Sequence, residues 1–365
     1  MSTMPIAALR DIVGRFPTPR DEDWKYTDLA RARDISSRWL DAGGTRPSAT
    51  PDIAPLVDDI DADWFVIANG QLAGLPGIDG IEVTRLSSTM EESSDVGGPS
   101  GPNSRLKPLP QHDNALAEFN AALLESGLRL RIEGRPEKPL GLLFIDEAGA
   151  PSVSQGFVEI VFASGASGEL IEYHASRGNS EQYGNTILRI DIGANAAARH
   201  VRLQDRALHH VQTHRTTVSL GRDARFTSAS FDLGGGLVRN DIAIDIAQPG
   251  AEVDFAGLYL AGDGQHIDNH TRVDHRVGPA TSRQEYRGIL NGKCRCVWNG
   301  KAFVHEGADG TDADQANHNL LLSAQAEIDA KPELEIYTDD VKCSHGTTVG
   351  QLDETALFYL SLIHI

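Results

Sequence analysis

The sequence predicts a mainly β protein in which a core, residues 128–349, is flanked by helical regions. Short segments that alternate polar and apolar residues recur along this core, as in Asp241–Ile246 and Glu252–Ala256. Turns rich in glycine, asparagine and aspartate separate them, and no core segment has helical periodicity. About 220 residues made only of short strands are typical of a β-sandwich, a β-barrel or a β-helix.

The turns and the apolar runs of the core favour a β-helix. Glycine-rich turns such as Gly234–Gly236 and Ala261–Gly264 recur without hairpin dipeptides between every pair of strands. Asn317–Asn319 precede three leucines, as in coils with asparagine at their corners and stacked aliphatic residues inside. Because no exact repeat is visible, the pattern alone leaves the sandwich open.

Residues 1–127 are expected to form a helical and mixed region. Apolar residues at helical spacing predict a helix in the first forty residues, interrupted at Pro17 and Pro19. The strand-like run Trp64–Ala68 precedes Asn-Gly, which readily takes positive φ at both turn positions, so a hairpin is predicted.

A second amphipathic helix is predicted over Ala115–Leu123, with Gly127 as its stop signal. Residues 41–60 and 87–113 are rich in Pro, Gly, Ser and Asp. We interpret these two segments as linkers or mobile loops.

The composition excludes several classes of protein. With 33 Lys and Arg against 52 Asp and Glu, the net charge of −19 repels a phosphate backbone, so nucleic acid is not an expected partner. Three cysteines do not make a disulfide framework and suit a reducing compartment. No window approaches the roughly 20 apolar residues of a membrane span, and no secretory signal is visible. A cytoplasmic protein without a membrane segment is expected.

The best site candidate is the pair Cys343 and His345, in the run Asp-Asp-Val-Lys-Cys-Ser-His-Gly. On an extended strand, side chains two residues apart project from one face, where these two could share a metal ion. The alternative is a buried structural thiol beside a surface histidine.

These residues also carry a resemblance to a known family. Residues 311–360, from Thr-Asp-Ala-Asp-Gln to Leu-Phe-Tyr-Leu, closely resemble the segment that identifies the SufD branch of the SufB/SufD family of iron–sulfur cluster assembly proteins. Asp23–Thr27, His266–Thr271 and Tyr286–Gly288 are similar to family positions as well. The amino-terminal Trp-Lys-Tyr-Thr is a feature of SufD rather than of its paralogue SufB, which remains the alternative.

The resemblance implies a right-handed parallel β-helix that acts as a non-catalytic scaffold. It implies pairing with SufB through β-helix edges and binding of the ATPase SufC through C-terminal helices. It also implies a nascent iron–sulfur cluster, held transiently at the SufB interface by Cys343 and His345.

His345 is the stronger ligand candidate, because a neutral imidazole binds iron without losing a proton near neutral pH. Cys343 has to lose a proton first, which Asp339 and Asp340 oppose and Lys342 favours.

Three further groups are weaker candidates. Cys294 and Cys296 alternate like a metal pair, but with coils of roughly twenty residues the 47 residues to Cys343 span two to three coils. We therefore interpret both as interior apolar residues.

The remaining candidates are histidine-containing. The row His266, Asp268 and His270, followed by Asp274 and His275, fits either a divalent ion or a polar ladder on a solvated sheet face, and His209, His210 and His214 lie in a turn-like stretch.

Enzymatic motifs are missing from the sequence. It contains no P-loop, so the chain itself is expected to bind no nucleotide, and no Gly-x-Ser-x-Gly elbow. A carbohydrate-active β-helix enzyme is the alternative function, but no pair of carboxylates stands out for it.

Residues 350–365 are expected to begin a truncated C-terminal helical region. Members of the resembled family continue past Leu-Phe-Tyr-Leu with two or more helices that dock SufC. Here the string Leu360–Ile365 matches the translation of a sequencing-library transposon end, so residues 361–365 are interpreted as non-native. Most of the SufC contact is then expected to be missing, and a helix from about Asp353 is expected to expose an apolar face. That face comprises Ala356, Leu357, Tyr359 and Leu360.

Overall fold

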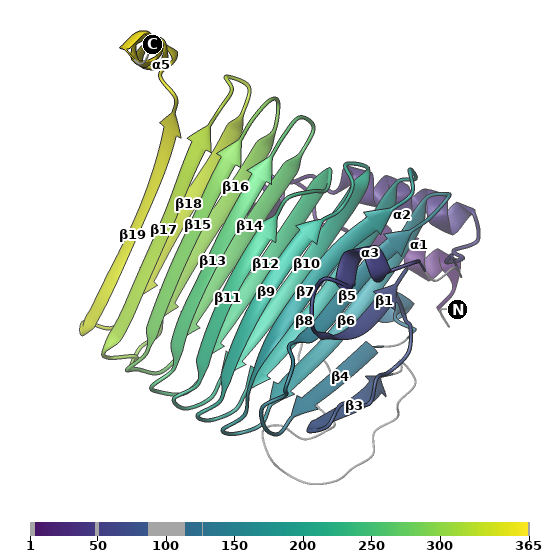
Figure 1. Cartoon of the computed structure of the whole chain (residues 1–365), viewed down its shortest axis with the longest axis horizontal. Coiled ribbons are helices and arrows are strands. Elements are labelled where there is room, and N and C mark those ends of the chain that lie inside the picture. The colour runs from purple at the N-terminus through teal and green to yellow at the C-terminus, as the bar shows by residue number, and fades with distance from the viewer. Residues whose placement is uncertain (1–3, 48–50, 87–113, 126, 364–365) are drawn as a thin grey trace.

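The computed structural model describes residues 4–47, 51–86, 114–125 and 127–363, and it is a β-solenoid of about seven turns. From β4 on, successive strands alternate between a nine-stranded and a ten-stranded sheet, and the strands of the solenoid pair in parallel (Figure 1). The predicted mainly β class and parallel β-helix are confirmed.

The ten-stranded sheet holds the odd-numbered strands except β3, together with β2. In sheet order these are β19 (Val341–Gln351), β17 (Thr311–Leu321), β15 (Thr281–Leu290), β13 (Glu252–Ala261), β11 (Arg225–Asp232), β9 (Ala197–Asp205), β7 (Ser167–Arg177), β5 (Leu140–Glu147), β1 (Asp63–Ala68) and β2 (Gln71–Leu72).

The nine-stranded sheet holds the even-numbered strands except β2, together with β3. In sheet order these are β18 (Glu327–Ile336), β16 (Arg295–Val304), β14 (His266–His275), β12 (Leu237–Ile246), β10 (His210–Leu220), β8 (Gln182–Ile192), β6 (Ser152–Phe162), β4 (Gly127–Ile132) and β3 (Ile81–Leu86).

Each coil contributes one strand to each sheet and takes about 30 residues, as in the contact of Arg202 with Asp232 at a separation of 30. The expected coil of roughly twenty residues is therefore wrong. A coil of this length fits two strands of about ten residues and two turns, which is why no short repeat is visible in the sequence.

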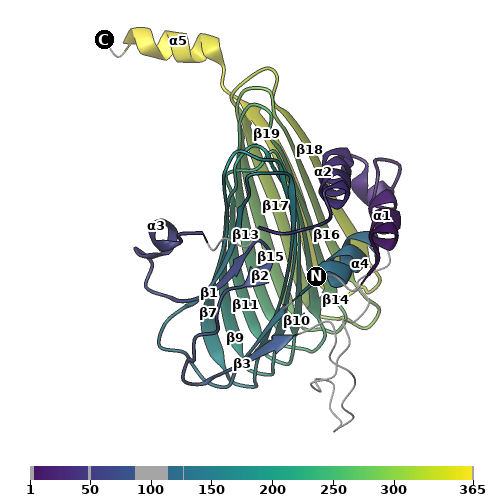
Figure 2. The same cartoon turned by 90° about the vertical axis from the view of Figure 1, so that its right-hand side faces the viewer.

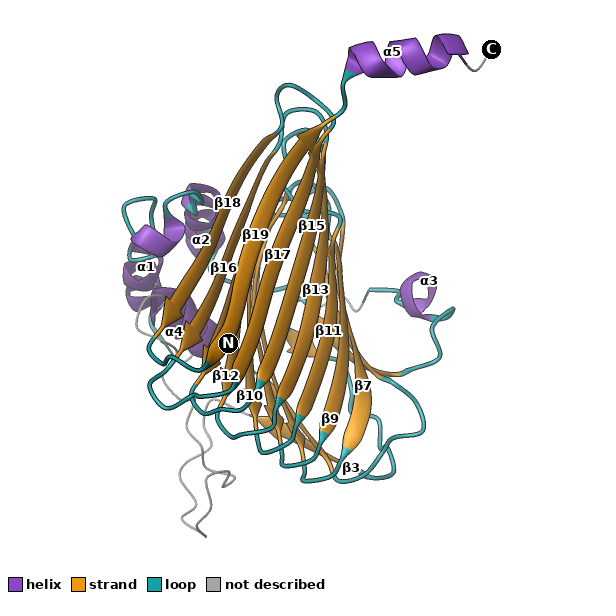
Figure 3. Cartoon of the chain, turned by 90° about the vertical axis from the view of Figure 1, so that its left-hand side faces the viewer, coloured by secondary structure: helices purple, strands orange, loops and turns teal. Residues whose placement is uncertain are grey.

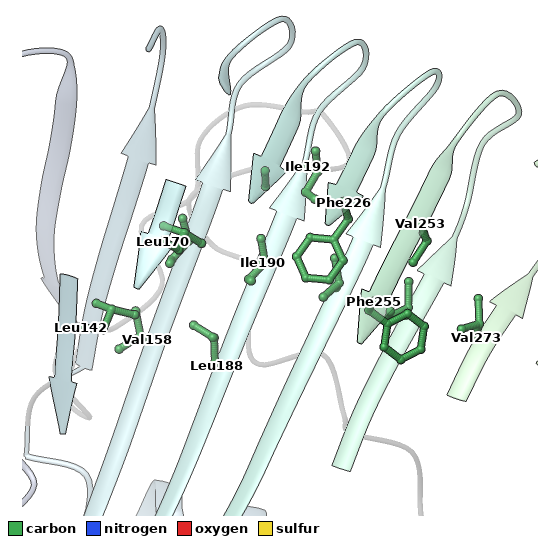
Figure 4. Packing of buried hydrophobic residues seen from close by; sticks show 14 of the residues in the cluster. Leu142, Val158, Leu170, Leu188, Ile190, Ile192, Phe226, Val253, Phe255 and Val273 are labelled. Atoms are coloured by element: carbon green, nitrogen blue, oxygen red, sulfur yellow. The ribbon is translucent and has the colours of Figure 1, made fainter. Parts of the chain in front are cut away.

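Apolar side chains stack in columns between the two sheets (Figure 4). Leu142, Leu170 and Phe226 of the ten-stranded sheet face Val158 and Leu188 of the nine-stranded sheet within one cluster. Such a continuous core supplies most of the stability of a solenoid, because each coil contacts only its neighbours.

Two tyrosines of the interior pack over glycines of the adjacent coil. Gly257 is in register with Tyr286, and Gly288 is in register with Tyr259. A Cβ atom at either glycine would overlap the facing aromatic ring. The missing side chains therefore create the space for both rings, which are almost completely buried.

The helices of the amino-terminal region cover one face of the solenoid (Figure 2). Their apolar side chains form one cluster with Val153, Tyr183 and Val211 of the nine-stranded sheet. The helices on this face are α1 (Ile6–Gly14), the 3₁₀ turn Glu22–Trp24, α2 (Ala30–Asp41) and α4 (Asn114–Leu123). The short helix α3 (Ala54–Val57) lies apart, on the other side of the solenoid.

The predicted hairpin is confirmed, since β1 and β2 pair antiparallel around Asn69 and Gly70, both with positive φ. The predicted helix over Ala115–Leu123 corresponds to α4, although Gly127 begins β4 rather than ending the helix. The predicted linker 41–60 contains α3, whereas segment 87–113 lies outside the described residues.

The far end of the solenoid is formed by β18 and β19, beyond which α5 (Glu354–Ile363) stands clear of the body (Figure 3). Leu357, Tyr359 and Leu360 of α5 are exposed, as predicted. Within the described part of the chain, no helix is long and apolar enough to cross a bilayer.

Candidate functional site

Cys343 and His345, called the terminal pair below, lie on β19, the last strand of the ten-stranded sheet. Their partners in register on β17 are Ala313 and Gln315, which are only 1% and 3% exposed. Side chains at paired positions of a parallel ladder point to the same side of the sheet. The terminal pair therefore projects toward the interior of the last coil.

The interior of this last coil is open. Within the described residues β18 and β19 end their sheets, so no further coil covers the terminal pair (Figure 3). As a result Cys343 is half-buried and His345 is exposed, although the same positions one coil earlier are buried.

The protonation of Cys343 depends on the preceding coil. Burial raises the pKa of the Cys343 thiol, and the negative charge of Asp312 raises it further. A hydrogen bond with the Ala313 backbone lowers this pKa but does not offset the other two effects. The sequence predicts that Asp339 and Asp340 oppose thiolate formation, but the carboxylate that raises the pKa of this thiol is Asp312 of β17. The thiol is neutral near pH 7, so metal binding has to displace its proton.

The terminal pair supplies only two ligands. Among the described residues, it does not belong to any group of three or more His, Cys, Asp and Glu side chains whose ligand atoms converge. Structural zinc sites and iron–sulfur clusters usually take four protein ligands. A metal or cluster at this end therefore needs ligands from outside this chain's described residues.

The other two cysteines are interior residues, as predicted. Cys294 and Cys296 are 5% and 0% exposed within the main apolar cluster, and burial raises the pKa of Cys296 well above its usual range. The 47 residues from Cys296 to Cys343 are only about one and a half coils, not two to three, because each coil is longer than expected. Cys296 and Cys343 nevertheless belong to opposite sheets, since β16 is in the nine-stranded sheet and β19 is in the ten-stranded sheet.

The row His266, Asp268 and His270 docks the amino-terminal segment. Asp268 is fully buried and accepts a hydrogen bond from Thr27, whose hydroxyl also lies 2.8 Å from Nε2 of His266. The expectation of a solvated polar ladder is therefore wrong. Two family-like motifs, 241 residues apart, contact each other instead.

Arg239 completes this contact, which we call the amino-terminal clamp (Trp24, Thr27, Arg239 and Asp268). The Arg239 guanidinium is 2.6 Å from Asp268 and 2.8 Å from Asp241, and it lies over the Trp24 ring at 4.4 Å from the centroid. Burial lowers the pKa of Arg239, but Asp241 and Asp268 more than offset this and raise it. The clamp thus holds a buried cation between two carboxylates and an aromatic face.

The solenoid also brings together an interior carboxylate and three imidazoles that were not predicted from the sequence as a group. These are Glu172 and His174 on β7, His200 on β9 and His214 on β10, called the interior cluster below. The prediction that His210 and His214 lie in a turn is wrong, because both are buried on β10. The sequence did carry a signal for this cluster. Glu172 and His174 are two residues apart, which places them on one face of a strand, and His200 follows Glu172 by 28 residues, about one coil.

The carboxylate of Glu172 is the centre of this cluster. Its Oε1 lies 2.7 Å from Nε2 of His174 and 3.3 Å from Nε2 of His214, and its Oε2 lies 3.0 Å from Nε2 of His200. Burial lowers the pKa of both His174 and His214. Burial would raise the pKa of Glu172, but the neighbouring imidazoles outweigh it and keep this pKa below its usual range. The carboxylate is therefore ionised beside the neutral imidazoles of His174 and His214 at neutral pH.

A buried histidine elsewhere makes stability depend on pH. His275, whose Nε2 is 2.8 Å from Oγ of Ser282, is completely buried, and burial lowers its pKa to about 4. The unfolded chain, with a histidine pKa near 6.5, takes up the proton first as the pH falls, so the contribution present above pH 6.5 is lost toward pH 4. Between pH 7 and 5 we expect this residue to reduce the free energy of unfolding by about 2 kcal/mol.

Urea unfolding at both pH values checks this expectation. His275→Gln should show a pH dependence weaker by about 2 kcal/mol, whereas His318→Gln, which removes an exposed imidazole, should behave like the wild type. An unchanged pH dependence in His275→Gln would contradict the assignment.

Comparison with known proteins identifies the chain. Residues 144–362 match the family model described as "SUF system FeS cluster assembly, SufBD core domain". The sequence is 31% identical to the iron–sulfur cluster assembly protein SufD of Escherichia coli, over 94% of this chain and 79% of that protein. It is 27% identical to a SufBD family protein of Synechocystis, over 96% of this chain and 80% of that protein.

The chain is therefore similar, over almost its whole length, to iron–sulfur cluster assembly proteins. Within that class, the chain belongs to the SufBD family. The resemblance stated from the sequence is confirmed at this level.

Proposed function

We propose that this chain is a non-catalytic scaffold subunit of the SufD type, whose terminal pair helps to hold a nascent iron–sulfur cluster against a SufB subunit. The cluster is cargo in this role. The observation that carries the proposal is the orientation of Cys343 and His345 toward the interior of a coil that no further described strand covers. A second β-helix stacked on this end would enclose the pair, just as the last coil encloses Ala313 and Gln315.

The backbone of the open end supports the same arrangement. β18 and β19 each have one side without a paired strand among the described residues, and such edges can add a strand from another chain through backbone hydrogen bonds. The partner would then supply the ligands that the terminal pair lacks. We assign the contact with the ATPase SufC to the C-terminal helical region that begins with α5, where exposed apolar side chains are available.

The relatives named SufD favour this type of subunit over SufB. No observation in the structure favours a carbohydrate-active enzyme.

The proposal is tested by co-expressing the chain with SufB and SufC and measuring the cluster yield of the purified complex. In His345→Ala we expect the yield to fall by about tenfold or more, because an exposed ligand is lost at the shared site. Cys343→Ala should also reduce it, and visible absorbance together with acid-labile sulfide provides the measurement.

Two matched variants serve as controls. His318→Ala removes an exposed imidazole from β17, and Cys294→Ala removes an interior thiol. Both should retain the cluster. A wild-type yield in the Cys343→Ala, His345→Ala double variant, within an intact complex, would refute the proposed role.

A further inference from the structure

The interior cluster has the donor atoms of a metal site. Glu172, His174 and His214 each offer one ligand atom, and these atoms lie within 4.8 Å of one another. His174 and Glu172 belong to the ten-stranded sheet and His214 to the nine-stranded sheet. An ion held between them would therefore join the two sheets across the interior.

The donor set also selects a class of ion. Two imidazoles and one carboxylate are typical ligands of divalent first-row transition metals such as iron and zinc. His200, with Nε2 at 3.0 Å from the other oxygen of Glu172, contacts the same carboxylate but is not one of the three residues whose ligand atoms converge. The absence of a thiol among these four residues distinguishes this set from the terminal pair.

The charge balance leaves room for a cation. Arg202 is paired with Asp232 at 2.9 Å, and Arg206 is paired with Asp146. Three carboxylates therefore face two guanidiniums, so one negative charge, that of Glu172, is shared only with imidazoles among the ion pairs of the described residues. A buried carboxylate is costly without a counter-charge, which a divalent ion would supply.

Polar atoms without a partner lie on β10, the strand that carries His214. Both amide atoms of the buried Gln212, which alternates with His214 on the same side of β10, have no hydrogen-bond partner, and neither has Nδ1 of His214. Buried polar groups are nearly always satisfied, so such a gathering indicates a bound species in this interior.

We propose that Glu172, His174 and His214 bind one divalent first-row transition-metal ion inside the β-helix. This is a site separate from the terminal pair, since β7 and β19 are six strand spacings or about 29 Å apart. Binding at Nε2 places the proton of His174 on Nδ1, so the 3.5 Å contact of that atom with Arg206 opens. The ion cross-links the sheets and stabilises the middle coils.

Cobalt(II) is the probe that tests this site. The metal-free full chain is titrated with Co²⁺ under anaerobic conditions, and we expect one equivalent to bind with visible d–d absorption and a raised unfolding temperature. In Glu172→Gln the affinity should fall by at least about 100-fold, the upper end of the effect of removing even an outer-shell partner. The Cys343→Ala, His345→Ala double variant should bind cobalt like the wild type.

The wild-type titration decides the question even if a variant fails to fold. No d–d absorption and no stoichiometric cobalt in the folded wild type would overturn the site. So would undiminished binding by a folded Glu172→Gln or His214→Gln variant. Loss of the cobalt signal only in the Cys343→Ala, His345→Ala variant would place the metal at the terminal pair and overturn the proposal as well.

Discussion

Replacing Arg239 with alanine is expected to lower the free energy of unfolding by about 3–5 kcal/mol, the effect of removing one partner from a buried ion pair. Arg239 is only 1% exposed and lies between the carboxylates of Asp241 and Asp268. Without it, the fully buried Asp268 keeps the hydroxyl of Thr27 and the imidazole of His270 but no guanidinium. The Trp24 ring also loses the cation that packs against it.

Urea unfolding measures this loss, and limited proteolysis shows where it acts. We expect the amino-terminal segment to be cleaved faster in Arg239→Ala, because the clamp fastens that segment to β14. The control is Arg276→Ala, which breaks an ion pair with Asp245 in which both side chains are about half-exposed, and it should change stability by no more than about 1 kcal/mol. Equal effects of the two substitutions would contradict the role given to the clamp.

Gly257→Ala is expected to destabilise the solenoid by about 1–3 kcal/mol through overpacking. The added methyl group would overlap the ring of Tyr286, which is 1% exposed and is enclosed by Phe255 and Trp298. The ring cannot swing into solvent, so neighbouring coils have to shift.

A control and a double variant make this test specific. Gly350→Ala adds the same methyl group to β19, where the nearest atom would be 3.7 Å away, and should be nearly neutral. Adding Tyr286→Leu to Gly257→Ala should relieve part of the overlap, so the two effects should not be additive. Additive losses would show that the ring and the glycine do not share this space.

Local features of the fold could be predicted from the sequence. The alternation of Glu252–Ala256 indicated a strand, and Asn69-Gly70 indicated the hairpin of β1 and β2. The choice between β-helix and sandwich could not be made locally, because it depends on which strands pair. That pairing joins residues about 30 positions apart, as in Arg202 and Asp232, and no repeated motif marks them.

For the candidate site, too, the local pattern could be predicted from the sequence but its place in the fold could not. Alternation places Cys343 and His345 on one face, but only the register with β17 shows that this face is the interior one. The interior cluster was missed because Glu172 and His214 belong to different sheets. Asp268 was misread because its partner Thr27 is remote in sequence.

The amino-terminal clamp has a consequence for synthesis on the ribosome. Thr27 is translated 241 residues before Asp268, a delay of roughly 12–50 s at 5–20 residues per second. Throughout that interval the clamp cannot close, although the earlier coils already offer Val153, Tyr183 and Val211 to the amino-terminal helices. The first-made segment thus completes its docking only after β14 has been made, and apolar surface that is still exposed until then favours aggregation of the nascent chain.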